Sequence, residues 1–311
     1  MSLLCVGSVA YDVIELPGRG PVEVLGGSAT YFASAASLLT TPALVAVVGD
    51  DFREEDRAFL EHRGVDLRGL EHRPGPTFRW HGRYHQDLKG RDSVATELGV
   101  FAEFNPVIPE ELRAPDVLFL GNIAPELQAR VLAQCSGARF IGLDTIELWI
   151  RTRQEALRSL LPKVDLLFLN DEEVMLLAGE TNVVTAARRV LAMGPRALVV
   201  KRGEHGACLF TEDRIALVPA FPVEAVVDPT GAGDSFAAGT CGYIDLARDF
   251  GADAVRAALV VGTVVASFSV ESCGPRAFDR VMHQALMSRL RKYLDMVAVD
   301  RERVLETVGA V

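Results

Sequence analysis

The clearest chemistry in the sequence comes from a short run of small and acidic residues at positions 228–236. It reads Asp-Pro-Thr-Gly-Ala-Gly-Asp-Ser-Phe, with Gly231 and Gly233 on either side of Ala232. Glycine lets the backbone approach a ligand closely, and a helix of small residues is predicted to start here. The amides at a helix start point outward and attract negative charge. We therefore predict an anion site, with a phosphate as a suitable ligand.

Asp234 belongs to the same run, although a carboxylate repels an anion bound beside it. General-base chemistry would explain its presence, because a carboxylate can take the proton of a hydroxyl that attacks a phosphoryl group. The alternative is a glycine-rich helix start in which Asp234 or Ser235 is an ordinary N-cap. The run is no dinucleotide fingerprint, since the third glycine is missing, and no P-loop, since no Gly-Lys-Ser/Thr follows.

Short apolar runs separated by helical patterns predict the elements that position this motif. Runs without polar residues are typical of strands buried on both faces of a parallel sheet. Strands that alternate with helices indicate an α/β doubly wound sheet. The predicted strands are residues 3–6, 43–48, 117–120, 140–143, 166–169 and 198–200, with helices at 126–135, 154–161 and 183–193. Short strands at 215–218 and 225–227 follow, and then helices at 232–246, 254–268 and 276–296.

Small or polar residues follow nearly every predicted strand. They include Asp144, Asn170 and Lys201, together with the pairs at 7–8, 49–50 and 121–122. In open α/β sheets ligands bind at the carboxyl ends of the strands, so the set as a whole predicts a ligand-binding edge. Taken one at a time, each of these residues is also explained as an ordinary turn residue.

Two segments interrupt the alternation of strands and helices. Residues 13–25 contain Pro and Gly between short apolar pieces, and residues 77–105 begin with a strand pattern. In that pattern charged side chains alternate with Phe78, Trp80, Gly82 and Tyr84, as in a strand with one wet face. We expect a small separate sheet, inserted in a single domain of residues 1–311. Such a sheet would be a lid or a dimer interface.

Composition excludes several classes of protein. The 311 residues are 49% hydrophobic and 24% charged, as in globular proteins with a large core. The net charge is −10 and no dense Lys/Arg cluster is present, so a nucleic-acid partner is not expected. Five scattered cysteines without a CxxC pair favour a reducing cytoplasm. No uninterrupted apolar run reaches the ~20 residues of a membrane span, so no membrane partner is expected either.

In their order and spacing, the motifs resemble those of the ribokinase-like carbohydrate kinases, also called the phosphofructokinase-B family. The run at 228–236 looks like the family's C-terminal signature, and residues 170–173 match its Asn-x-x-Glu element. Residues 6–12, the pair Gly26-Gly27 and the turn at 201–206 are similar to further landmarks. The resemblance implies a three-layer αβα fold with a central, mostly parallel sheet and a small β lid.

The resemblance also implies roles on the phosphate side of the site. Asp234 is then the catalytic base, and the amides of Gly231, Ala232 and Gly233 stabilise the transferring phosphoryl group. Asn170 and Glu173 help to hold Mg²⁺ largely through water; from the residues alone, the alternative is a helix cap with a first-turn acid. Asp228 matches a position near a monovalent-cation site in some relatives, which allows K⁺. The residues implied to line the ATP site are Asn170, Lys201, Gly203, Gly206, Thr230, Gly231 and Gly233.

On the acceptor side, the resemblance assigns Asp12 to substrate hydroxyls, with Gly26 and Gly27 close to the substrate at the lid hinge. Arg79 and Trp80 of the lid are expected to touch the substrate or a second subunit, so a homodimer through the lid is a further expectation. Many members carry Asn where this chain has Tyr31. An aromatic ring at that place puts ribose and fructose phosphate in doubt, unless the ring only packs in its helix.

We therefore expect an ATP-dependent kinase that phosphorylates a hydroxyl of a small polyhydroxy substrate, either a sugar or a cyclitol. The acceptor is expected to be unphosphorylated, because no basic cluster apart from the lid side chains would bind a second phosphate. A nucleoside kinase of the same fold is the first alternative. A non-catalytic regulator that binds sugars or nucleotides is the second, and Asp234 and the intact glycines argue against it.

Overall fold

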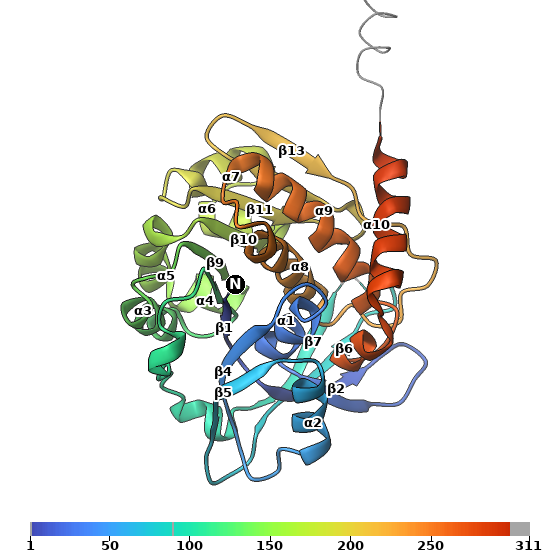
Figure 1. The fold of residues 1–311 in the computed structure, drawn as a ribbon. Helices are drawn as coiled ribbons and strands as arrows, with labels where there is room; N and C mark the ends of the chain where they lie inside the picture. Colours follow the sequence, from blue (N-terminus) through green and yellow to red (C-terminus); the bar gives the residue numbers. More distant parts are fainter. Residues whose placement is uncertain (1, 89, 299–311) are drawn as a thin grey trace, which may run out of the picture.

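A nine-stranded, mostly parallel sheet lies at the centre of the computed structural model, which describes residues 2–88 and 90–298 (Figure 1). The order across the sheet is β13 (Ile215–Val218), β12 (Ala207–Phe210), β11 (Ala197–Lys201), β10 (Leu166–Asn170), β9 (Phe140–Asp144), β8 (Val117–Leu120), β1 (Leu3–Val6), β4 (Pro42–Val48) and β5 (Asp66–His72). Neighbours are parallel from β11 to β5. Strands β12 and β13 run antiparallel at one edge. Each of the six apolar runs forms a strand, as predicted.

Helices cover both faces of this sheet, because successive side chains of each strand point to opposite sides. In β1, Leu3 and Cys5 pack into one core, whereas Leu4 and Val6 pack into the other. The first core is covered by α1 (Ser28–Ala36), α2 (Glu54–His62), α8 (Ala232–Ala247), α9 (Ala252–Ser269) and α10 (His283–Val297). The second is covered by α3 (Pro125–Gln134), α4 (Glu147–Thr152), α5 (Gln154–Leu160), α6 (Asp171–Ala178) and α7 (Val183–Leu191). The three-layer αβα architecture is confirmed.

Two predicted elements are wrong in detail. Residues 225–227 form no strand, and the Val227 amide instead donates to the carbonyl of Val270, the C-cap of α9, at 2.8 Å. The predicted helix at 276–296 is interrupted, since Val281 is extended between the 3₁₀ turn η5 (Pro275–Arg280) and α10. The polar edge strand β5 and the short strand β12 were not predicted.

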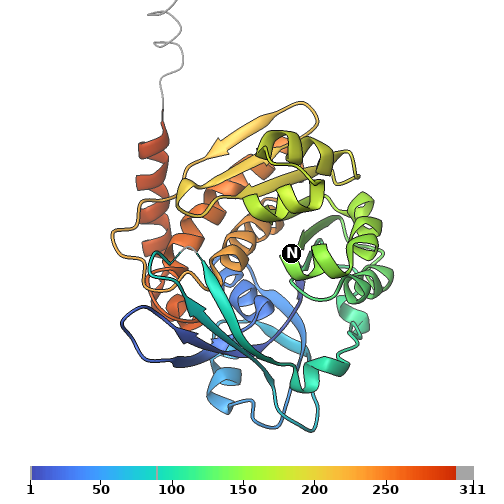
Figure 2. The same ribbon diagram turned by 180° about the vertical axis from the view of Figure 1, so that it is seen from behind.

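A second, four-stranded sheet projects from the main one, and we call it the lid sheet. Its order is β3 (Val22–Gly26), β2 (Ala10–Glu15), β6 (Phe78–Tyr84) and β7 (Arg91–Glu97). The blue and teal strands at the bottom of Figure 2 show it beside the N-terminal end of α8. The strands come from the two segments that interrupt the alternation, although β2 starts at Ala10, earlier than position 13. The insertion therefore lies directly between β1 and α1, and again after β5.

Helix α9 is long and apolar enough to cross a membrane by length and composition. It packs instead against α8 and α10, and 61% of its apolar window is buried inside the protein. Residues such as Leu259 and Val264 are fully buried in the first core. Burial on this scale is typical of the central helix of a globular domain, and it explains the apolar composition.

The aromatic stack at the centre of the first core generates a prediction about stability. The Phe119 side chain is 0% exposed and stacks on Phe32, with ring centroids 4.0 Å apart. We expect Phe119→Ala to lower the free energy of unfolding by about 3–5 kcal/mol, because the cavity cannot refill. Urea denaturation followed by circular dichroism measures this. Val107→Ala, at a position 66% exposed, should change it by less than ~0.5 kcal/mol, and an equal loss in both variants would contradict the assignment.

Candidate active site

The carboxyl ends of three neighbouring strands bring polar and charged side chains together. Asp144 ends β9, Asn170 ends β10 and Lys201 ends β11. The Lys201 Nζ donates to Asp144 Oδ2 at 2.7 Å, and a methyl group at Gly233 would lie 3.2 Å from the same nitrogen. Burial lowers the pKa of Lys201, but Asp144 and Glu173 more than offset this and raise it. Lys201 is therefore a permanent cation beside the start of α8.

The start of α8 presents backbone amides and no capping side chain. Gly231 is the N-cap, with φ 73°, a left-handed conformation that favours glycine. The amides of the first turn have no acceptor within the helix; that of Ala232 donates to the Pro229 carbonyl at 3.2 Å. Ser235 Oγ donates backwards to the Gly231 carbonyl, at 2.8 Å. Neither Asp234 nor Ser235 is therefore the N-cap, and the ordinary capping alternative is not what the structure shows.

Asp234 lies in this first turn and is only partly exposed. Burial raises the pKa of Asp234 to about 8, and the negative charge of Asp144 adds to the effect, while Lys201 opposes it. Asp12 lies on the acceptor side of Asp234 and contributes a further, smaller increase. A carboxylate with such a pKa can accept a proton near neutral pH, which is the property that a general base requires.

Asn170 and Glu173 form a capping box at the start of α6. Asn170 Oδ1 accepts from the Glu173 amide at 2.7 Å, and Glu173 Oε2 accepts from the Asn170 amide at 2.8 Å. Burial raises the pKa of Glu173 to about 7, and Lys201 opposes this increase. One oxygen of Glu173 remains for other partners. A helix cap and a role near the phosphates are therefore compatible for Asn170 and Glu173, because the cap fixes both side chains close to Lys201.

Asp12 is buried in β2 of the lid sheet, against the hinge glycines. A methyl group at Gly26 would overlap the Asp12 carboxylate, so a side chain there would displace it. Burial raises the pKa of Asp12 to about 7, while the Gly27 backbone amide opposes the increase. The structure thus brings Asp12, Gly26 and Gly27 together, as the sequence predicts.

Tyr31 connects the acceptor side with the anion site. Its side chain is 2% exposed, and its ring lies where a side chain at Gly231 would otherwise be. Among the described residues, its buried hydroxyl finds no hydrogen-bond partner, and neither does Oδ2 of Asp228, which is 0% exposed. Burial raises the pKa of Tyr31, and Asp12 and Asp228 raise it further. Two unsatisfied polar atoms therefore point into one site, which is unfavourable unless a ligand pairs with them.

The lid sheet presents different residues on its two faces. Asp12 is opposite Trp80 in the β2–β6 register, and Tyr84 Oη lies 2.8 Å from Thr230 Oγ1. These side chains face the site. Arg79 points to the other face, where it pairs with Asp51 at 2.8 Å and with Glu23. The structure therefore joins Trp80 and Thr230 to the candidate site but does not join Arg79 to it.

The remaining predicted residues lie in two turns, one after β11 and one before α8. Gly203 and Gly206 form the turn between β11 and β12, directly after the lysine. Asp228 Oδ1 accepts from the Thr230 amide at 2.9 Å and so closes the turn that leads into α8. Asp144 is a residue of this site to which the motifs assign no role. It does belong to the set of polar residues that follow predicted strands, and that membership could have identified it.

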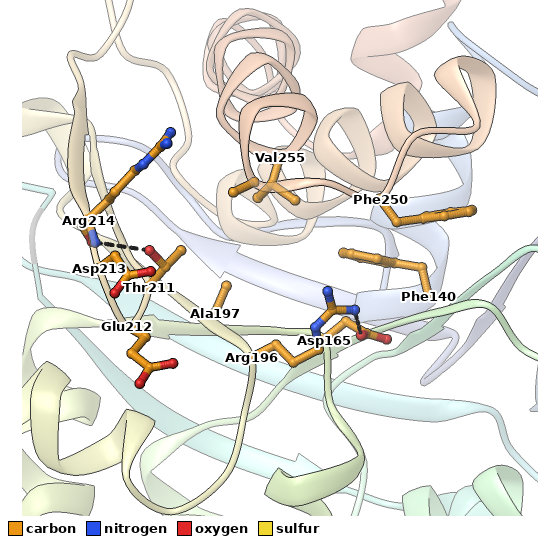
Figure 3. A pocket seen from close by; sticks show the side chains of 11 residues that line it. Phe140, Asp165, Arg196, Ala197, Thr211, Glu212, Asp213, Arg214, Phe250 and Val255 are labelled. Carbon is orange, nitrogen blue, oxygen red and sulfur yellow. Dashed lines mark hydrogen bonds and ion pairs between the residues drawn. The ribbon is translucent and has the colours of Figure 1, made fainter.

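A separate pocket lies at the opposite edge of the sheet (Figure 3). Phe140 and Phe250 face each other in it, and Arg196 pairs with Asp165 at 2.8 Å. Phe140, Asp165 and Arg196 lie at the beginnings of β9, β10 and β11, and Phe250 lies between α8 and α9. Asp144, Asn170 and Lys201 lie at the other ends of the same strands. The pocket is therefore remote from the site described above.

Comparisons with known proteins place the chain among kinases. The sequence model of the family described as "pfkB family carbohydrate kinase" matches residues 1–280. A cytidine kinase from Thermococcus kodakarensis is 31% identical over 246 residues, which cover 77% of this chain and 87% of that protein. An inositol 3-kinase from Oryza sativa subsp. japonica is 30% identical over 317 residues, covering 93% and 73%. A solved structure of a putative ribokinase II from E. coli, in complex with ATP and Mg²⁺, has a TM-score of 0.75 at 20% identity, covering 95% of this chain and 99% of that one.

The raised pKa of Asp234 generates a prediction about stability and pH. Its folded pKa of about 8 exceeds its ordinary value of 3.8, so the folded state binds the proton more tightly than the unfolded state. Ionisation of Asp234 therefore lowers stability progressively as pH rises from about 4 to about 8. We expect Asp234→Asn to be more stable than the unmutated protein, by a margin that grows by up to ~1.4 kcal/mol per pH unit across this range.

Urea denaturation at pH 5, 6.5 and 8, without nucleotide or Mg²⁺, measures that margin. The exposed substitution Asp213→Asn is the matched control for the same chemical change outside the site. A margin for Asp234→Asn that stays constant from pH 5 to pH 8 would contradict the assignment.

Proposed function

The chain belongs to the pfkB family of carbohydrate kinases and is a phosphotransferase, and on this basis we propose the reaction that it catalyses. It transfers the γ-phosphoryl group of ATP to a hydroxyl of a small, unphosphorylated sugar or cyclitol. The observation that carries the proposal is the position of Asp234. Its carboxylate belongs to the first turn of α8, where the charges of Asp144, Lys201 and Asp12 all act on it.

In the proposed reaction, Asp234 takes the proton of the acceptor hydroxyl as that oxygen attacks the γ-phosphorus. The new O–P bond forms while the bond to the β-phosphate oxygen breaks, and ADP leaves. The backbone amides of Gly231 and Gly233 and the Nζ of Lys201 stabilise the negative charge on the transferring group. The carboxylate at Asp144 holds Lys201 in place at 2.7 Å.

The residues of the phosphate side fit Mg²⁺ bound mainly through water and phosphate oxygens. Among the described residues, no cluster of three or more acidic, His or Cys side chains would enclose a metal, and Mg²⁺ takes few protein ligands. Glu173 retains one free oxygen beside Lys201, so Glu173 and Asn170 would hold the hydrated ion. Bound Mg²⁺ would neutralise phosphate charge. The unpaired Oδ2 of Asp228 supports K⁺ as a further proposed ion.

The acceptor side suits a neutral polyhydroxy compound. Asp12 and Asp228 offer carboxylate oxygens to hydroxyl donors, and the Tyr31 hydroxyl is free to pair with one more. These acids would repel an acceptor that already carries a phosphate. Trp80 and Tyr84 of the lid sheet close the site from the other side, and closure excludes water that would otherwise hydrolyse ATP.

A nucleoside is the second candidate acceptor. Trp80 and Tyr84 supply aromatic surface on the site face of the lid sheet, and such surface can stack on a base. The similarity to a cytidine kinase supports the same alternative. A non-catalytic regulator remains the least favoured proposal, because a binding protein has no need of Asp234.

Two further features of the protein are proposed with this function. Strands β3 and β7 are the edges of the lid sheet, and Val22 and Val94 on them are exposed. These edges support a homodimer that forms through the lid. The described cysteines are all free thiols, which suits a cytoplasmic location.

The proposed reaction predicts acceptor-dependent release of ADP from ATP and Mg²⁺. We expect one member of a panel of sugars, cyclitols and nucleosides to stimulate it, and Asp234→Asn to lower kcat by at least ~10²–10⁴-fold. A coupled ADP assay with product identification measures both. Stimulation only by a nucleoside would select the second candidate, and near-full turnover of Asp234→Asn would remove the base assignment.

The unpaired hydroxyl of Tyr31 predicts opposite effects on stability and on binding. Tyr31→Phe removes a buried polar atom without a partner, so the ligand-free protein should become more stable by about 1 kcal/mol or remain unchanged. If the hydroxyl pairs with the acceptor, KM for that acceptor should rise about tenfold, with kcat changed less. Thermal unfolding and steady-state kinetics test the two effects. An unchanged KM would show that the ring only packs against Gly231.

A further inference from the structure

The arginines of the lid sheet differ in whether their charge is neutralised. Arg79 and Arg83 point to the face away from the site, and both are paired with carboxylates. Arg79 binds Asp51 and Glu23, and Arg83 binds Glu15. These ion pairs neutralise the charges of Arg79 and Arg83 and stabilise the outer face of the lid sheet.

Arg91 differs from both of these. It is an exposed residue at the start of β7, directly opposite Tyr84 in the β6–β7 register, so it shares the site face. Its guanidinium carbon lies 5.4 Å from the centroid of the Trp80 ring and 6.0 Å from that of Tyr84. Within the part of the chain that the structure describes, no ion pair joins it to a carboxylate. The aromatic rings therefore hold the Arg91 guanidinium in place, and its charge remains available to bind an anion.

The surroundings of Arg91 place this charge over the site. Trp80 is opposite Asp12 in the lid sheet, and Tyr84 Oη lies 2.8 Å from Thr230 Oγ1 at the entry to α8. The positive charge of Arg91 lowers the pKa of Asp12, Asp228, Asp234 and Glu173, each of which is raised overall by burial. These acids come from β2, α6, α8 and the loop that leads into α8. The charge of Arg91 therefore acts both on Asp12, on the proposed acceptor side, and on Glu173, on the proposed phosphate side.

We propose that Arg91 contacts the phosphoryl group during transfer and is a catalytic residue supplied by the lid sheet. The inference rests on the proposed kinase activity. A guanidinium presents several donors in one plane, which suits the equatorial oxygens of a phosphoryl group that passes between two oxygens. Lys201 reaches the same group from the main sheet, so the two cations would approach it from opposite sides.

This arrangement links positive charge to closure of the lid sheet. In the structure Tyr84 Oη lies 2.8 Å from Thr230 Oγ1, so the lid sheet meets the start of α8 and holds Arg91 on the site face. In the proposed reaction, movement of the lid sheet away from α8 would remove Arg91 and leave Lys201 as the cation of the main sheet. Transfer would then depend on contact between the lid sheet and α8, because that contact supplies the second cation.

The test uses Arg91→Gln, Arg91→Lys and the matched control Arg83→Gln, which removes an arginine from the outer face of the same sheet. We expect Arg91→Gln to lower kcat about 10²-fold with a small change in acceptor KM, and Arg91→Lys to recover part of the loss. Affinity for ADP with Mg²⁺ and aluminium fluoride, a mimic of the transferring phosphoryl group, should fall by a similar factor in Arg91→Gln. Affinity for a non-hydrolysable ATP analogue should change little, and Arg83→Gln should match the unmutated protein.

Three results would overturn the inference. Equal activity of Arg91→Gln and Arg83→Gln would leave Arg91 as a packing residue. A loss confined to acceptor KM, or confined to phosphorylated acceptors, would make it an acceptor-binding residue. If Arg91→Gln lowers the unfolding temperature as well as kcat, and Arg91→Lys restores neither, the role of Arg91 is structural. Absence of transfer in the unmutated protein with every acceptor would instead reject the proposed function, and this inference with it.

Discussion

The concentration of acidic groups in a poorly hydrated site is the constraint on which the rest of this structure depends. Asp12, Asp144, Glu173 and Asp234 come from four elements, and Asp228 comes from the loop before α8. Lys201 is the cation of the main sheet among them. Burial raises the pKa of Asp12 and Glu173 to about 7 and that of Asp234 to about 8. The fold tolerates this because the 2.7 Å pair of Lys201 and Asp144 compensates one acid fully, and the helix amides at α8 offer partial positive charge.

The lid sheet completes the site without belonging to the main core. Its strands hold Asp12 against Gly26 and place Trp80 and Tyr84 on the face toward α8. The main sheet supplies the fixed part of the site, since its strands are buried on both faces and end in the polar residues that act. The two sheets meet at α8, where the ring of Tyr31 lies against Gly231 and Tyr84 meets Thr230.

Much of this arrangement could be predicted from the sequence, for physical reasons that also explain the failures. Buried strands such as β8 and β10 can be recognised from the sequence, because both of their faces are covered and therefore consist mainly of apolar residues. The start of α8 is recognisable because close approach of a ligand demands small residues. The edge strand β5 is half-buried and polar, so its sequence lacks the apolar pattern of a buried strand. Residues 225–227 have that apolar pattern but form no strand.

Side-chain direction in the lid sheet could not be predicted in the same way. Arg79 and Trp80 are adjacent, so one must face the site and the other must not, and the choice depends on the register of β2 with β6. A bulge between His81 and Gly82 then sets which residues of β7 face inward. Similarly, nothing in the sequence shows that Lys201 pairs with Asp144, 57 residues away.

The contact between Tyr31 and Gly231 has a consequence for how the family can diversify. The aromatic ring occupies the space that any side chain at position 231 would need. As long as a large residue stands at position 31, position 231 must remain glycine on grounds of volume as well as of backbone conformation. A smaller residue at position 31 would relax the first requirement only. The volumes at positions 31 and 231 therefore cannot change independently, and a substitution at position 31 also alters the packing behind the turn that starts α8.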